Sequence, residues 1–401
     1  MIILFATSFL FLAFLGYKLN GKYIAPTALI PSVWGALLLL YGILDLQLND
    51  LSNTVLYVLL LWVVFSLFGS YVFSTVNLSL GKPKILKVSD FNPSIRSLYY
   101  YIAIIGTVVW IYIAYKQITT MSISSNIFTN LRYANIHSES EEVEHQYGIF
   151  KYTFNIAFVS LLIELFSLNK NKYRVKILII LNILLSFITM AKTSFLFLFL
   201  SILFSRIFKY KISLKKIIVV SIILFLLMFG IHHIRSEVKN SIAEIFEIYF
   251  FAGLPALDKI VENDMRVTQP GIMSFRFFYN VNTRLFGGNK VAREFLNNVT
   301  QGGYVFVPLP TNVFTVIGPF WWDFGWLGVI AFGFINGALA GILYNKSKQK
   351  QTWAIIAYSY IACTLILQFF GEYIFTNLSN TIQIIALLLF AYNLKWVFKW
   401  R

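Results

Sequence analysis

The sequence predicts an all-α polytopic integral membrane protein with about eleven transmembrane helices. Three observations predict this class: 58% of the 401 residues are hydrophobic, only 12% are charged, and the hydrophobic residues form long uninterrupted blocks. A bilayer core of about 30 Å requires roughly 20 mostly apolar residues per spanning helix. Strands of a membrane barrel would instead alternate apolar and polar residues over about ten positions. No soluble domain remains outside the apolar blocks.

The predicted spans follow one another with mostly short polar connections. In chain order they are 2–17, 24–44, 54–76, 97–115, 149–168, 175–190, 193–208, 215–232, 325–344, 353–370 and 378–398. The first lacks a basic start and a small-residue cleavage site, so we expect it to be retained as a span and not removed as a signal peptide. We treat residues 1–401 as a single polytopic membrane domain.

The net charge of +16 follows the connections between spans. If the N-terminus lies outside and the spans alternate, the inner connections hold most of the 33 lysines and arginines and one clear acid, Asp90. Cytoplasmic loops of membrane proteins carry such an excess of basic residues. This pattern favours an odd number of spans over an even one. It also explains the basicity without a nucleic-acid partner.

Two long outer loops interrupt the series, at 117–148 and 234–324. The second loop contains two aromatic-rich stretches, "EIFEIYFFAGLPAL" (244–257) and "IMSFRFFYNVNTRLFGG" (272–288), which predict short helices at the membrane interface. Its end, "PLPTNVFTVIGPFWWDFGWLG" (308–328), is unusually polar. Here the prolines favour extended backbone before Thr311, and Asn312 and Thr315 can cap or line a helix start. We expect Gly318 and Pro319 to break that turn before the next span.

Missing motifs exclude several classes of enzyme. The sequence has no G-x-x-x-x-G-K-[ST] loop, no H-E-x-x-H pair and no G-x-S-x-G turn. The single cysteine, Cys363, lies within a span and is typical of a small apolar core residue. We therefore expect chemistry on the outer face that uses no cofactor and no metal.

Basic residues near the outer ends of spans are candidates for binding phosphate, because the arginine fork suits bidentate recognition of phosphate oxygens. These candidates are Arg132, Lys192, Arg235, Arg276 and Arg284. The alternative is that such arginines pair with neighbouring acids, as Arg266 could with Asp264 or Glu262. Three tryptophans, Trp321, Trp322 and Trp326, could stack on sugars or form an ordinary interfacial belt.

Few titratable groups lie close to membrane depth on the outer side. Glu372 stands between "QFFG" and "YIF", where an ionisable group is costly unless it is paired or hydrated. It is either a functional residue or half of a structural salt bridge. Asp323 precedes the ninth span, and His232 ends the eighth. His232 and the adjacent His233 point about 100° apart on a helix, which disfavours a shared metal.

Three stretches resemble the O-antigen polymerases, the Wzy-type repeat-unit polymerases of bacterial inner membranes. "LPTNVFTVIGPFWWDFGWLG" resembles the family's Pro-Thr-Asn stretch that opens a span, with Phe314 in place of its tyrosine. "GEYIFTNLSNTIQII" resembles its late outer turn and matches Glu372, Thr376 and Asn377. "NLRYANI" resembles its first outer-loop arginine, at Arg132, and "AKTS" supplies Lys192.

The resemblance implies a glycosyltransferase that polymerises undecaprenyl-diphosphate-linked oligosaccharide repeat units on the periplasmic face of the inner membrane. Its partners would be that lipid-linked substrate, membrane lipid and, as a candidate, a chain-length-determining membrane protein. In this scheme the basic residues hold diphosphate. If the linkage forms with inversion, the base is Glu372, or else Asp323 or His232.

Asn312, Thr315 and Asn377 would then orient sugar hydroxyls.

Two alternative functions are open. An O-antigen ligase would share the spans and the large loop, but the Pro-Thr-Asn stretch argues against it. A lipid-linked oligosaccharide flippase predicts charges in the middle of several spans, whereas this sequence keeps nearly all its charges at span ends.

Overall fold

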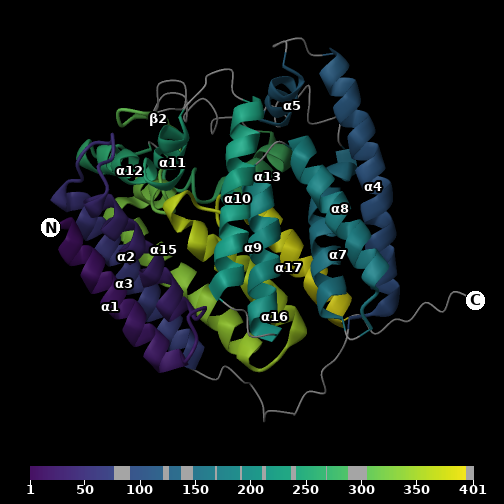
Figure 1. Ribbon diagram of the computed structural model, residues 1–401, viewed down its shortest axis with the longest axis horizontal. Coiled ribbons are helices and arrows are strands. Elements are labelled where there is room, and N and C mark those ends of the chain that lie inside the picture. The colour runs from purple at the N-terminus through teal and green to yellow at the C-terminus, as the bar shows by residue number, and fades with distance from the viewer. Residues whose placement is uncertain are drawn as a thin grey trace, which may run out of the picture. The chain divides into compact units, whose positions relative to one another are not determined.

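The computed structural model describes residues 1–75, 91–120, 126–136, 148–167, 169–189, 192–209, 214–235, 241–267, 269–287 and 305–393 (Figure 1). Residues 76–90 and 394–401, and large parts of both predicted outer loops, lie outside the described residues.

Each of the eleven predicted segments coincides with a helix. These helices are α1 (Ile2–Asn20), α2 (Pro26–Ile43), α3 (Asn53–Thr75), α4 (Pro93–Thr120), α7 (Thr153–Phe166), α8 (Lys172–Thr189), α9 (Lys192–Lys209), α10 (Leu214–Arg235), α15 (Gly318–Lys348), α16 (Thr352–Ile366) and α17 (Leu378–Asn393). Among the described residues, seven helical segments are long and apolar enough to cross a membrane. The chain is therefore an all-α, multi-pass membrane protein, and the count of eleven spans stays a prediction.

The aromatic-rich stretches of the second long loop form short helices, as predicted. They are α11 (Ile242–Phe250), α12 (Gly253–Glu262) and α13 (Arg276–Phe286). Ser241 caps α11 by accepting a hydrogen bond from the backbone N–H of Glu244. Gly287, with a φ of 67°, ends α13. The smaller elements are α5 (Ile127–Ile136), η2 (Gly148–Tyr152), η3 (Leu367–Phe369), β1 (Val305–Phe306) and β2 (Pro310–Thr311).

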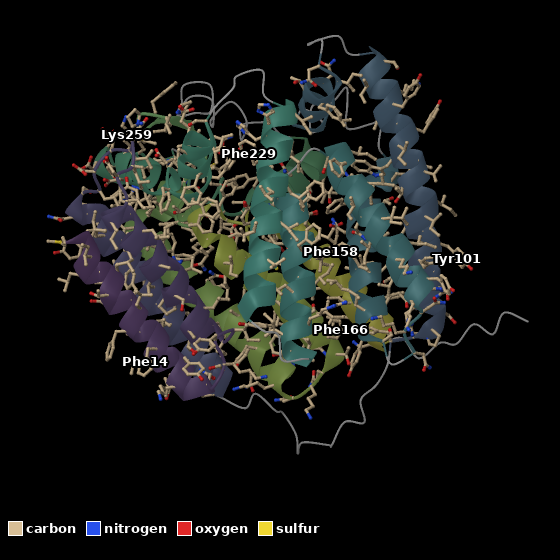
Figure 2. All side chains as sticks on the ribbon, in the orientation of Figure 1. Phe14, Tyr101, Phe158, Phe166, Phe229 and Lys259 are labelled. Carbon is tan, nitrogen blue, oxygen red and sulfur yellow. The ribbon has the colours of Figure 1, made fainter. Side chains whose placement is uncertain are left out.

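The chain divides into two compact units, each described by itself. Unit 1 comprises Met1–Lys84, Ser241–Gln349 and Ile361–Thr381, and unit 2 comprises Ile85–Asn240, Lys350–Tyr360 and Ile382–Arg401. The helices α16 and α17 each contribute residues to both units. Exposed apolar side chains are common on the span-length helices, as Phe14 and Tyr101 illustrate (Figure 2). Such surfaces are expected where lipid is the surrounding solvent.

Unit 1 is built on the contact between α3 and α15, where small residues bring two backbones together. Glycines recur every fourth residue in α15, at Gly333, Gly337 and Gly341, and all three approach α3. A Cβ atom added to Gly337 would lie only 1.9 Å from the carbonyl oxygen of Ser66. Gly69 of α3 makes the reciprocal approach to the carbonyl oxygen of Phe334, at 2.2 Å from its ideal Cβ. Such spacing of small residues is typical of closely packed helices in membranes.

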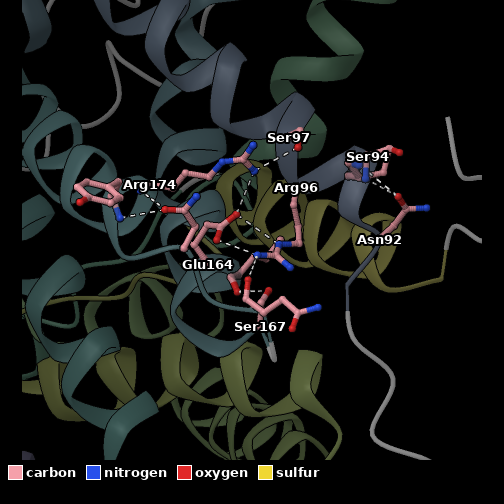
Figure 3. A network of polar contacts seen from close by, with 12 residues as sticks. Asn92, Ser94, Arg96, Ser97, Glu164, Ser167 and Arg174 are labelled. Carbon is pink, nitrogen blue, oxygen red and sulfur yellow. Dashed lines mark hydrogen bonds and ion pairs between the residues drawn. The ribbon is translucent and has the colours of Figure 1, made fainter. Parts of the chain in front are cut away.

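Unit 2 contains a buried ion network that joins three helices (Figure 3). Arg96 of α4 donates to Glu164 of α7 at 2.9 Å and to the carbonyl oxygen of Asn169 at 3.0 Å. Arg174 of α8 approaches the same carboxylate at 3.6 Å and donates to Ser97. The Glu164 side chain is 1% exposed. A buried carboxylate at this position requires such partners, because an unpaired charge would cost several kcal/mol.

We predict that the α3–α15 contact does not tolerate a side chain at Gly337. Gly337→Ala should lower the free energy of unfolding by about 2 kcal/mol or more, because the new methyl group meets backbone atoms that cannot rotate away. The measurement is the thermal unfolding temperature of the purified protein in detergent. The matched control is Gly230→Ala in α10, where an added Cβ has no neighbour within 4 Å. Equal unfolding temperatures for the two variants would contradict the prediction.

Candidate functional site

The segment 305–317 precedes α15. It is not helical, and backbone hydrogen bonds hold it in place. The strands β1 and β2 pair antiparallel, with Val305 opposite Thr311 and Phe306 opposite Pro310. The extended backbone predicted before Thr311 is confirmed. The peptide bond between Val307 and Pro308 is cis. Lys259 of α12 donates to the carbonyl oxygen of Phe306 at 2.7 Å, which fastens this hairpin to the rest of unit 1.

Thr315 lies at the centre of the segment in an uncommon backbone conformation. Its φ is 58°, in the left-handed region that β-branched residues rarely adopt. It forms a parallel bridge with Gly371, and the next residue, Val316, donates its N–H to the carbonyl oxygen of Gln368 at 2.7 Å. The Thr315 hydroxyl accepts the N–H of Ile317 at 3.2 Å. Strained conformations persist where the surroundings determine them, and they concentrate at functional sites.

Gln368 ties this segment to the core, and the sequence reasoning missed it. Its side-chain carbonyl accepts the indole N–H groups of Trp34 and Trp62 at 3.0 and 3.3 Å. Its backbone carbonyl oxygen accepts the hydrogen bond from the N–H of Val316. The available signal was an amide in the otherwise apolar run "LILQFF", since buried polar groups need partners.

Glu372 organises the turn that follows η3. Its carboxylate accepts backbone N–H hydrogen bonds from Ile374, Phe375 and Thr376 at 2.6–3.0 Å. Each oxygen accepts two of these bonds, so the lone pairs of the carboxylate are occupied. Burial raises the pKa of the Glu372 carboxyl, whereas the backbone N–H donors act in the opposite direction by favouring the ionised form.

Asp323 plays a similar role at the start of α15. Its two oxygens accept the N–H groups of Met273 and Ser274 at 3.1 and 2.6 Å, and its residue is 6% exposed. These bonds hold the backbone immediately before Arg276, the first residue of α13. The carboxylate therefore fixes where α13 begins relative to α15.

The helix α15 bends where the sequence analysis expected it to begin. The expectation that Gly318 and Pro319 break a helical turn is wrong, because the helix starts at Gly318 with proline in its first turn. Neither Asn312 nor Thr315 caps it, since the N-cap residue is Ile317. The actual break is at Gly325, whose φ of 58° and ψ of −134° are not helical.

The Arg266 side chain lies against the backbone at Gly325, where a larger residue would displace it. A Cβ atom there would lie 1.7 Å from the guanidinium of Arg266. That guanidinium stacks over the ring of Trp321 at 4.6 Å and its Nε donates to Asp264 at 2.7 Å. The pairing of Arg266 with Asp264, raised as an alternative to phosphate binding, is confirmed.

The three tryptophans do not form one surface. Trp321 and Trp322 are 2% and 3% exposed, so neither sugar stacking nor an interfacial belt describes them in this structure. Trp322 packs edge-on against Phe314, and Trp321 packs against Trp326. Only Trp326 is substantially exposed.

The three residues predicted to orient sugars differ in accessibility. Asn312 and Asn377 are exposed, whereas Thr315 is 1% exposed and its hydroxyl serves the local turn. Two exposed amides on rigid turns can offer both donors and acceptors to hydroxyl groups.

In unit 2 the other predicted basic residues belong to three helices, α5, α9 and α10, that share one apolar cluster. Leu131 of α5, Phe195 of α9 and Ile231 of α10 share one apolar cluster. Lys192, the first residue of α9, is 6% exposed and places its Nζ atom 3.0 Å from Nδ1 of His232. Two predicted phosphate ligands flank this cluster in the chain: Arg132 directly follows Leu131 in α5, and Arg235 ends α10 one turn after Ile231.

Of Arg132, Arg235 and Arg284, the structure describes only the backbones. The described residues contain no group of three His, Cys, Asp or Glu side chains that could hold a metal ion.

The sequence is similar to that of one protein family. A family model described as "Putative O-antigen polymerase" matches residues 1–369. A protein of Escherichia coli (strain K12) named "Putative O-antigen polymerase" is 27% identical over 196 residues, which cover 45% of this chain and 50% of that protein. The match thus spans half of that relative. No solved structure matches the chain.

We predict that Glu372→Gln weakens unit 1. The amide replaces one carboxylate oxygen by a nitrogen that faces backbone N–H donors, and each buried donor left without an acceptor costs about 1–3 kcal/mol. The unfolding temperature should therefore fall well below that of Glu262→Gln, the same substitution at an exposed position. If both variants unfold at the same temperature, the hydrogen bonds of Glu372 do not hold the turn.

Proposed function

Because the chain belongs to the O-antigen polymerase family, we propose that it is a membrane glycosyltransferase that polymerises lipid-linked oligosaccharide repeat units during O-antigen biosynthesis. The substrate is an oligosaccharide on undecaprenyl diphosphate. The enzyme lies in the bacterial inner membrane with about eleven spans, and its site faces the periplasm.

In the proposed reaction, a hydroxyl at the non-reducing end of one lipid-linked repeat unit attacks the anomeric carbon of the growing chain. A new glycosidic C–O bond forms as the C–O bond to the diphosphate breaks. Undecaprenyl diphosphate leaves with the electron pair, and a base receives the hydroxyl proton. Because diphosphate is already a good leaving group, the catalyst mainly has to position the reactants and stabilise the departing charge.

The observation that best supports this chemistry is the basic end of unit 2. A buried ammonium, Lys192, stands at the N-terminus of α9 beside His232. The N-terminus of a helix presents backbone N–H groups and a positive dipole end that favour anions, and a basic side chain there adds to the attraction for a diphosphate. Arg132 in α5 and Arg235 at the end of α10 belong to helices that share an apolar cluster with α9, so we assign them to the same diphosphate. Arg276 and Arg284 of α13 are further candidates in unit 1.

The base is proposed among three groups. Glu372 is the first choice because its burial raises its pKa, which makes the carboxylate a stronger proton acceptor. In the resting turn its oxygens are occupied, so its action as a base requires one backbone donor to give way to the acceptor hydroxyl. Asp323, bonded to Met273 and Ser274, and His232 are the alternatives.

Sugar positioning is assigned to two exposed amides, of which Asn377 follows a turn that the buried carboxylate of Glu372 holds in place. Asn377 follows directly after the Glu372 turn, and Asn312 follows β2. Thr315 would act indirectly by fixing the backbone between them. A chain-length-determining membrane protein is the candidate protein partner.

The function is tested by deleting the gene in its host and displaying the surface polysaccharide on a gel. Loss of a polymerase leaves a single repeat unit on the lipid core. Loss of a ligase or a flippase leaves none. A full ladder in the deletion strain would contradict the proposal, and complementation with the wild-type gene should restore the normal ladder.

We predict that Lys192→Gln shortens the ladder, whereas Lys192→Arg retains most of the wild-type pattern. Removing one charge-assisted contact to diphosphate should cost about 1.5–3 kcal/mol, or roughly tenfold or more in the rate at low substrate. The control is Lys172→Gln, which removes an exposed lysine from α8 of the same unit. Equal ladders for Lys192→Gln and the control, at equal protein levels, would remove Lys192 from the diphosphate site.

A further inference from the structure

The helix α13 carries an apolar stripe that no described part of the protein covers. Phe278, Val281 and Leu285 are three and four residues apart, so they share one face of the helix. They are 55%, 36% and 70% exposed, and the adjacent Phe286 is 79% exposed. So large an exposed apolar surface on an 11-residue helix indicates an interaction with something apolar.

The depth of α13 relative to the bilayer is set by its attachment to α15. Phe275, the N-cap residue of α13, packs against Phe324 and Phe332 with ring centroids 6.3 and 5.7 Å apart. The carboxylate of Asp323 holds the two residues before it. Phe332 lies about two turns beyond the Gly325 break, which is about 10 Å into the straight part of the span. The start of α13 is thus tied to the end of a membrane-spanning helix.

The charge of α13 is entirely positive. It contains Arg276 and Arg284 and no acid. Arg276, Asn280 and Thr283 are also three and four residues apart, so they share one face of the helix. At about 100° per residue, that face lies opposite the apolar stripe. At about 16 Å in length the helix is too short to cross a bilayer. An apolar face, a basic polar face and attachment at the membrane boundary are the features of helices that lie in the headgroup region.

We propose that α13 is a membrane-surface anchor whose apolar stripe is buried among the acyl chains of the surrounding bilayer and whose net positive charge attracts anionic lipid to the headgroup region around it. The occupant is the bulk lipid of the membrane in which the spans sit. The apolar surface of α13 then continues the exposed lipid-facing surface of those spans. This inference does not rest on the proposed catalytic activity.

Spin labels in lipid nanodiscs test the proposal. Cys363, the single cysteine of the chain, is first replaced by serine. A label at Leu285→Cys then reports the apolar face, and one at Asn280→Cys reports the opposite face of the same helix. Phe278→Cys provides a second position on the apolar stripe if the first variant does not fold. Power-saturation spectroscopy compares the accessibility of each label to oxygen, which partitions into lipid, and to a water-soluble nickel complex.

The expected result is a higher accessibility to oxygen than to nickel at 285 and the reverse at 280. Adding phosphatidylglycerol to phosphatidylcholine nanodiscs should shift the label at 285 to a greater depth. Higher accessibility to nickel at both positions would place α13 in water and overturn the proposal. Protection of 285 from both reagents would show a protein partner, such as a second copy, in place of lipid. A depth independent of phosphatidylglycerol would overturn the role of the arginines.

Discussion

The close contact between α3 and α15 is the constraint on which unit 1 depends. Three glycines at every fourth position let the backbones of the two helices approach until there is no room for a side chain at Gly337. In a bilayer, helix association gains little from the hydrophobic effect, so close packing of this kind supplies much of the driving force. It fixes the part of α15 that follows the Gly325 bend, whereas Asp323 and its hydrogen bonds to the residues before α13 precede that bend.

Buried carboxylates hold the turns that adjoin this pair of helices. Asp323 and Glu372 hold backbone N–H groups of two turns, and Asp258 and Glu247 do the same for the connection between α2 and α3, at Ser52 and Gln47. Each bond satisfies a backbone donor that would otherwise be buried without a partner. The same four acids could serve chemistry only by giving up part of this role, which links catalysis to local turn stability.

The sequence was sufficient to place the helices but not their contacts. Uninterrupted apolar runs predicted a helix in each of eleven places, because length and hydrophobicity determine spans locally. The proximity of Lys192 to His232 could not be predicted, since forty residues separate them and tertiary packing alone joins them. Asn312 and Thr315 seemed equivalent in sequence. In the structure Asn312 is exposed, whereas Thr315 is buried and its backbone forms a bridge with Gly371. The contact of Arg266 with the backbone at Gly325 joins residues that are distant in the chain.

The central claim is that this chain joins lipid-linked repeat units to one another. The most direct measurement uses the purified protein in nanodiscs with a single oligosaccharide repeat unit on undecaprenyl diphosphate. Mass spectrometry should detect lipid-linked dimers, trimers and longer chains, together with one released undecaprenyl diphosphate for each new linkage. A substrate that stays unchanged would contradict the claim. Transfer only to an added lipid A core acceptor would contradict it as well.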